Sequence, residues 1–161
     1  MLSVYKNVLL LFFLVLFLSP ISSYAQRKIS YERVNFKEIG SSELELLVFY
    51  PENRHLKNGC PAIVFFFGGG WISGGKTQFI NHAKYFAKRG LVSFLVDYRT
   101  ESKNNTTPFE ALKDAKSAIR YIRENASTFN IDENKIVASG GSAGGHLAAA
   151  TALIEGFNEE S

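Results

Sequence analysis

Cysteine is almost absent from this sequence, which has one, Cys60, among 161 residues. A lone cysteine excludes a disulfide framework within the chain, and its place just before an apolar run predicts a small buried side chain. The spacing of the histidine, aspartate and glutamate residues also matches no metal-ligand pattern. The sequence therefore predicts neither a metal site nor a cofactor.

A strong charge of either sign is missing as well. The 18 lysine and arginine residues face 15 aspartate and glutamate residues, which gives a formal net charge of +3. Such a mild balance argues against the basic surface on which nucleic-acid binding depends. We expect no nucleic-acid partner, and the composition leaves the oligomeric state open.

Long apolar runs are limited to one, near the N-terminus. Residues 8–18 are eleven consecutive apolar residues, too few for a membrane-spanning helix, which needs about 20. The run follows Lys6 and precedes Pro20 and small residues at 23 and 25, which is the organisation of a secretory signal peptide. We predict a signal peptide over residues 1–25, a secreted or periplasmic protein, and no stable membrane insertion after cleavage. An uncleaved anchor is the alternative.

Among the features that are present, a G-x-S-x-G pattern at residues 140–144 is the most informative. Apolar residues 135–139 before it predict a buried strand, and the alanine-rich residues 143–153 predict a helix. A serine hydroxyl is a weak nucleophile until a base takes its proton, and a sharp strand-to-helix turn holds it clear of the backbone. Ser142 is therefore the candidate nucleophile. The alternative is a glycine-rich turn that carries an ordinary surface serine.

A second glycine-rich segment, residues 68–70, follows the apolar run 62–67 and precedes Trp71. Acyl transfer builds negative charge on a carbonyl oxygen, and the N–H groups of a loop without side chains can approach that oxygen closely. A phosphate-binding loop is disfavoured because no G-x-x-x-x-G-K-[ST] pattern occurs. The segment predicts part of an oxyanion hole, with Trp71 as the best candidate for substrate contact. A flexible loop over apolar surface is the alternative.

The remaining patterns predict one α/β domain over residues 26–161. Two alternating stretches around Gly40 predict a leading antiparallel hairpin, and apolar strands then alternate with helices. Because strands alternate with helices, we expect a doubly wound, mostly parallel sheet, in which strands 62–67 and 91–96 are joined by a right-handed crossover. The expected strands are 29–39, 43–50, 62–67, 91–96 and 135–139, and the expected helices are 77–88, 108–125 and 143–153, with a polar, mobile loop over 99–107.

Together these motifs resemble the N-terminal half of an α/β-hydrolase of the hormone-sensitive-lipase-like or feruloyl- or acetyl-esterase-like group. The motif Asp97-Tyr98-Arg99, which follows a strand, strengthens the resemblance, and most of residues 29–158 is covered. The resemblance implies an α/β-hydrolase sheet whose C-terminal strands are missing. It also implies Ser142 as the catalytic nucleophile, Trp71 as a substrate-binding residue, and an oxyanion hole formed by Gly69, Gly70 and Ala143.

Two positions depart from the family pattern. Phe67 stands where many relatives have a histidine, and only nineteen residues follow Ser142. The family places its acidic residue and its catalytic histidine later in the chain, so we expect both to lie beyond residue 161 and residues 26–161 to be a partial domain. Asp97 is expected to pair with Arg99. None of the three histidines present is expected to be the catalytic base: His55, His82 and His146.

The resemblance implies a secreted serine hydrolase of carboxylic esters that works through an acyl-enzyme. The implied substrates are short acyl esters, either on small molecules or as acetyl or feruloyl groups on a polysaccharide. Two alternatives stay open. One is a serine peptidase of the same fold. The other is a non-catalytic fragment that lacks the acid and the histidine, in which strand 135–139 is a bare sheet edge available to another chain.

Overall fold

The computed structural model describes residues 31–52 and 59–159. The predicted signal peptide and His55 lie outside the described residues. No helix in the described part is long and apolar enough to cross a membrane. The strands are β1 (Tyr31–Ile39), β2 (Ser42–Phe49), β3 (Cys60–Phe66), β4 (Val92–Val96) and β5 (Ile131–Gly140), and the helices are η1 (Lys76–Phe79), α2 (Ile80–Ala87), α3 (Glu101–Asn104), α4 (Pro108–Glu124), α5 (Ala126–Phe129) and α6 (Ala143–Leu153).

The five strands form one sheet in the order β1-β2-β4-β3-β5. The predicted hairpin is present, because β1 pairs with β2 in antiparallel register around Gly40, whose φ is 58°. β2 is antiparallel to β4, whereas β3 is parallel to both β4 and β5. The sheet is therefore mixed, with a parallel half that carries the glycine-rich motifs, and the predicted fold class is confirmed.

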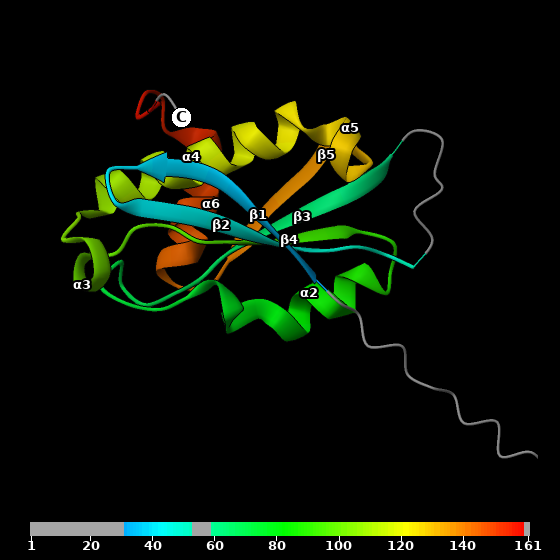
Figure 1. Ribbon diagram of the computed structural model, residues 1–161, viewed down its shortest axis with the longest axis horizontal. Helices are drawn as coiled ribbons and strands as arrows, with labels where there is room; N and C mark the ends of the chain where they lie inside the picture. Colours follow the sequence, from blue (N-terminus) through cyan, green and yellow to red (C-terminus); the bar gives the residue numbers. More distant parts are fainter. Residues whose placement is uncertain (1–30, 53–58, 160–161) are drawn as a thin grey trace, which may run out of the picture.

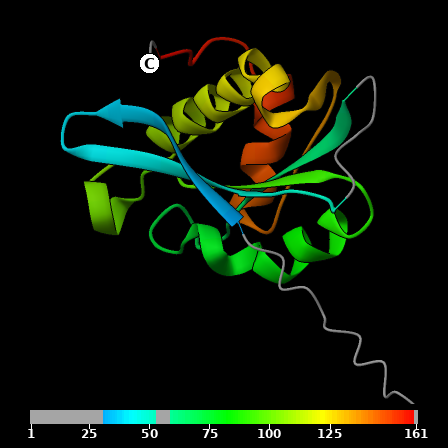
Figure 2. The ribbon, with the colours of Figure 1, turned by 45° about the vertical axis from the view of Figure 1, so that its right-hand side comes forward.

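Helices cover both faces of the sheet. Figure 1 shows α4, α5 and α6 on one side and α2 on the other, and Figure 2 shows the same layers after rotation. Alternate strand residues explain the two layers: Val64 and Phe66 pack toward the larger cluster with α4 and α6, whereas Ile63 and Phe65 pack toward α2. The free side of β5 is an edge of the described sheet.

Local sequence signals explain where α4 begins, whereas contacts with a distant loop explain why α3 forms. α4 begins at Pro108, as predicted, with a capping box in which the Phe109 N–H donates to Thr107 and the Thr107 N–H donates to Glu110. The prediction of a mobile loop over 99–107 was wrong in part, because α3 forms within it. Main-chain hydrogen bonds to the loop after β3 hold α3 in place.

A buried cluster of charges joins the hairpin to α4 and to the C-terminal segment. The Asp114 carboxylate is fully buried and accepts hydrogen bonds from Lys37 and Arg99, each at 2.8 Å. The predicted pairing of Asp97 with Arg99 was wrong, since Arg99 extends to Asp114 and Asp97 instead pairs with Lys76 at 2.8 Å. Both residues follow the end of β4, and their partners come from different elements: Lys76 lies in η1 and Asp114 in α4.

Candidate active site

The G-x-S-x-G pattern forms a sharp turn between β5 and α6. Ser142 has φ 53° and ψ −121°, a backbone conformation that residues with a side chain rarely adopt. The turn is closed by two hydrogen bonds: the Gly144 N–H donates to the Gly141 carbonyl at 2.9 Å, and the His146 N–H donates to the Ser142 carbonyl at 3.0 Å. This is the geometry that the spacing of the glycines predicts.

The glycines of the turn are needed because the turn packs on the end of β3. A Cβ added at Gly144 would lie 2.0 Å from the Phe66 carbonyl oxygen, and one added at Gly140 would lie 2.6 Å from the same oxygen. Phe66 and Gly140 are also register partners in the parallel pair of β3 and β5. The turn and the loop after β3 therefore meet at the carboxyl ends of neighbouring parallel strands, where ligands bind in open α/β sheets.

The loop after β3 lies against this turn. A Cβ at Gly68 would lie 2.7 Å from the Gly141 carbonyl oxygen and 3.5 Å from Ser142 Cβ. Gly69 and Gly70 have φ of 139° and 65°, in the region that favours glycine. Three glycines in a row thus bring main chain, rather than side chains, to the nucleophile candidate.

Three N–H groups at this junction are available to a ligand. The Gly68 N–H is not among them, because it donates to Gln78 Oε1 at 2.6 Å. Within residues 31–52 and 59–159, the N–H groups of Gly69, Gly70 and Ala143 have no hydrogen-bond partner. These are the three residues that the sequence predicts as an oxyanion hole. Gln78 was missed, because no pattern marks a glutamine that reaches back ten residues.

Tyr98 holds the start of the glycine loop through Phe67. Its ring stacks on Phe67, with ring centroids 3.9 Å apart, and its hydroxyl donates to the Phe67 carbonyl at 2.7 Å. Burial, reinforced by the negative charge of Asp97, raises the pKa of Tyr98 well above its usual value. The neutral phenol is the form that donates to the Phe67 carbonyl, so this hydrogen bond fixes the residue that directly precedes the three glycines.

Trp71 closes the loop beside α6. Its φ is 62°, unusual for a bulky residue, and its ring meets the edge of His146 with ring centroids 5.3 Å apart and planes at 89°. The indole Nε1 is buried and has no hydrogen-bond partner among the described residues. Trp71 therefore packs on a residue of α6, the helix that follows Ser142, and its indole nitrogen is an unused donor among the described residues, whereas its contact with substrate stays a prediction.

The two histidines that the structure describes contact other aromatic rings. His146 faces Trp71, and His82 packs against Phe65 and Phe79 on the layer of α2. In the described ranges, no imidazole or carboxylate hydrogen-bonds to the Ser142 hydroxyl.

The mixed sheet, the strained serine turn and the adjoining glycine loop define the α/β-hydrolase class, and comparisons with known proteins agree. Residues 46–161 match the BD-FAE family model. The chain belongs to the BD-FAE family.

Two relatives illustrate the match. Esterase 2 of Thermogutta terrifontis, solved after phosphorylation by paraoxon, is 42% identical with a TM-score of 0.79, over 82% of this chain and 51% of that one. Structures of the same esterase with propionate and with butyrate bound are 45% identical, with a TM-score of 0.73, over 75% of this chain and 44% of that one. Endo-1,4-beta-xylanase B of Butyrivibrio fibrisolvens is 32% identical over 108 residues, which are 67% of this chain and 17% of the xylanase.

A third relative, an AB hydrolase superfamily protein of Schizosaccharomyces pombe, is 38% identical over 106 residues. The match covers 63% of this chain and 30% of that protein. The chain thus spans about half the length of the solved esterase and less than a third of the length of these two curated relatives.

Proposed function

We propose that this chain carries the nucleophile and the oxyanion hole of a carboxylic-ester hydrolase that works through an acyl-enzyme. The observation that carries the proposal is the strained turn at Ser142 beside three unpartnered N–H groups. In the first step the Ser142 hydroxyl oxygen attacks the ester carbonyl and its proton passes to a histidine base, which the proposal places outside the described residues. The tetrahedral intermediate then expels the alcohol, which takes that proton, and leaves the acyl group on Ser142.

The oxyanion of that intermediate would be held by main-chain donors. The Ala143 N–H stands at the start of α6, and we propose that the Gly69 and Gly70 N–H groups of the loop after β3 complete the set. Donors of this kind are worth about 3 kcal/mol each in the transition state, because they are aimed before the charge forms. The helix macrodipole of α6 adds a favourable field at its N-terminus.

Short acyl groups are the substrates that we propose. The relative from Thermogutta terrifontis binds propionate and butyrate, and paraoxon, which reacts with activated nucleophiles, phosphorylates it. The similarity to a xylanase from Butyrivibrio fibrisolvens supports esters carried by a plant polysaccharide, with acetyl or feruloyl groups as the leading choices. Export by the predicted signal peptide would bring the enzyme to such a polymer.

The test is hydrolysis by the full-length protein. It should release 4-nitrophenol from 4-nitrophenyl acetate and acetate from acetylated xylan. Hydrolysis of a peptide 4-nitroanilide without hydrolysis of either ester would instead identify a peptidase, and no hydrolysis of any of the three would contradict the proposal.

Replacing Gly70 with valine should lower kcat for 4-nitrophenyl acetate about 100-fold and change KM little. A Cβ at Gly70 meets no atom within 4 Å, so the effect comes from its φ of 65°, which a β-branched residue cannot hold. The loop must then rearrange, and the lost hydrogen bond is one made mainly in the transition state. Gly75→Val is the matched control, since Gly75 is extended, with φ −174°, and equally open. A change in KM alone would assign the loop to substrate binding.

Gln78 is predicted to position the oxyanion loop without touching the substrate. Replacing it with leucine removes the acceptor of the Gly68 N–H and should lower kcat about fivefold, the effect of one hydrogen bond. Gln78→Glu retains an acceptor oxygen and should restore most of the rate. The neighbouring Thr77→Ala should leave kcat unchanged. If leucine and glutamate have equal effects, the hydrogen bond to Gly68 does not set the loop.

A further inference from the structure

A polar pocket of about 740 Å³ lies beside α3. Its walls are the β1–β2 turn with the start of β2, the two residues that follow β4, and α3 itself. Its volume is in the range of small-molecule sites. We call it the α3 pocket, and neither Ser142 nor the glycine loop lines it.

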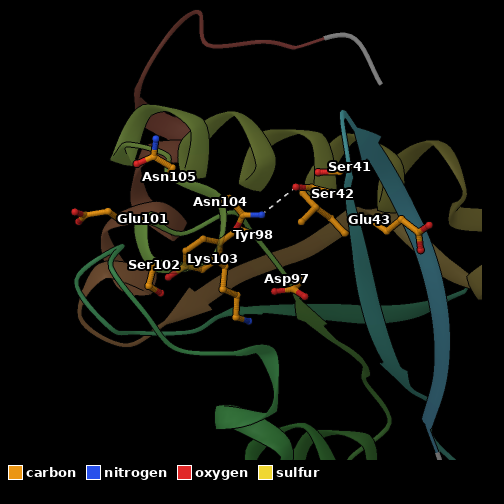
Figure 3. A pocket seen from close by; sticks show the side chains of 11 residues that line it. Ser41, Ser42, Glu43, Asp97, Tyr98, Glu101, Ser102, Lys103, Asn104 and Asn105 are labelled. Atoms are coloured by element: carbon orange, nitrogen blue, oxygen red, sulfur yellow. Dashed lines mark hydrogen bonds between the residues drawn. The ribbon is translucent and has the colours of Figure 1, made fainter.

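The α3 pocket is preformed. Asn104 donates to the Ser42 hydroxyl at 2.9 Å and accepts from the Thr100 N–H at 3.1 Å, so one amide braces α3 against the hairpin (Figure 3). Tyr98 is buried beneath, and its hydroxyl is already bonded to Phe67. Asp97 is held by Lys76 at 2.8 Å. A ligand would therefore find fixed groups rather than a surface that must first be ordered.

The lining chemistry suits an uncharged ligand with many hydroxyl groups. Asp97 supplies acceptor oxygens, whereas the Lys103 ammonium and the Ser102 hydroxyl form no hydrogen bond or ion pair within the described residues. Three carboxylates border the pocket, from Glu43, Asp97 and Glu101, against the single ammonium of Lys103, which disfavours a phosphate or a carboxylate ligand. No exposed aromatic ring or aliphatic wall is present among the lining residues to hold a long acyl chain.

The pocket is joined to the candidate active site through α3. The Glu101 N–H donates to the Trp71 carbonyl at 3.0 Å, and the Ser102 N–H donates to the Ile72 carbonyl at 2.9 Å. The same helix thus forms one wall of the pocket and, through these two hydrogen bonds, supports the residues that follow the three glycines. A chain of sugar residues attached to an ester at Ser142 could pass over this helix and reach the pocket.

We infer that the α3 pocket binds a sugar residue of the polysaccharide chain that carries the ester. The placement of the ester rests on the proposed function, whereas binding of the sugar does not. The consequence is specificity: contacts in the α3 pocket would favour esters on an oligosaccharide over small esters with the same acyl group.

The binding test uses the full-length Ser142→Ala protein and xylotriose, followed by calorimetry. Lys103→Ala should weaken binding about fivefold, the loss of one hydrogen bond, and Ser102→Trp should abolish it by filling the pocket. Neither side chain has a partner to lose, so both variants should fold. Lys88→Ala and Ser127→Trp, at exposed positions directly after α2 and on α5, are the matched controls. Tighter binding of spermidine or of phosphate than of xylotriose would overturn the inference, as would equal binding by all variants.

The kinetic test separates this inference from the proposed function. With Ser142 restored, Lys103→Ala should raise KM for acetylated xylotriose about fivefold, because one hydrogen bond is lost, and leave 4-nitrophenyl acetate turnover unchanged. An equal change for both substrates would show that the pocket only supports the loop and would contradict sugar binding. A wild-type protein that binds xylotriose but hydrolyses neither ester would contradict the esterase proposal alone.

Discussion

Replacing Ser142 with alanine in the full-length protein should lower kcat for 4-nitrophenyl acetate by a factor of about 10⁴ or more. The Ser142 hydroxyl makes no hydrogen bond within the described residues, so it does not stabilise the turn. Without that oxygen no acyl-enzyme can form, and the three N–H donors alone give only residual catalysis. Initial rates at saturating substrate measure the effect.

The fold should survive the same change. Because the strain at Ser142 lies in the backbone, removal of the hydroxyl leaves the turn and its two closing hydrogen bonds in place. The far-ultraviolet circular dichroism spectrum and the urea midpoint should match those of the parent. Ser127→Ala, at an exposed position of α5, controls for the loss of a serine hydroxyl elsewhere. Turnover retained by Ser142→Ala would remove this residue from the mechanism.

Replacing Asp114 with alanine should lower the free energy of unfolding by about 4 kcal/mol, because it breaks a buried ion pair from one side. The Asp114 carboxylate accepts from the Arg99 main-chain N–H at 3.0 Å as well as from the Lys37 and Arg99 side chains. The variant leaves the Lys37 ammonium, whose side chain is 1% exposed, with only Glu159 as an anionic partner. Urea denaturation followed by fluorescence measures the loss.

An exposed ion pair provides the comparison for Asp114. Asp132 pairs with Lys135 at 2.8 Å, but the lysine side chain is 62% exposed. Solvent screening makes such a pair weak, so Asp132→Ala should leave the urea midpoint close to that of the parent. Equal midpoints for the two aspartate variants would show that the buried cluster does not stabilise the fold.

Features that depend on local spacing could be predicted from the sequence. The turn at Ser142 follows from glycines two residues away on each side, and the hairpin follows from alternation around Gly40. The start of α4 follows from Pro108 and its capping residues. In each case the determining residues are neighbours along the chain. The sequence also predicts that the glycine loop lies near Ser142, because parallel strands bring their carboxyl ends together, and a Cβ at Gly68 would lie 3.5 Å from Ser142 Cβ; the roles of Gly69, Gly70 and Ala143 stay a prediction.

Features set by distant contacts could not be predicted in this way. α3 is stabilised by carbonyl groups of Trp71 and Ile72, thirty residues earlier, which no local pattern reveals. Arg99 selects Asp114 rather than the nearer Asp97 because packing of α4 on the sheet brings the buried carboxylate to it. The role of Gln78 was missed for the same reason, because its side chain accepts from the Gly68 N–H, ten residues earlier, only when the loop between them brings the two residues together.

Covalent labelling shows most directly whether Ser142 is the nucleophile. The full-length protein would be treated with paraoxon, digested with trypsin and sequenced by mass spectrometry. The peptide that begins at Ile136 contains both Ser139 and Ser142, so fragmentation distinguishes them. We predict a single diethyl phosphoryl group on Ser142, formed in proportion to the loss of 4-nitrophenyl acetate hydrolysis. A group on Ser139 or on another residue, or loss of activity with Ser142 unmodified, would contradict the account.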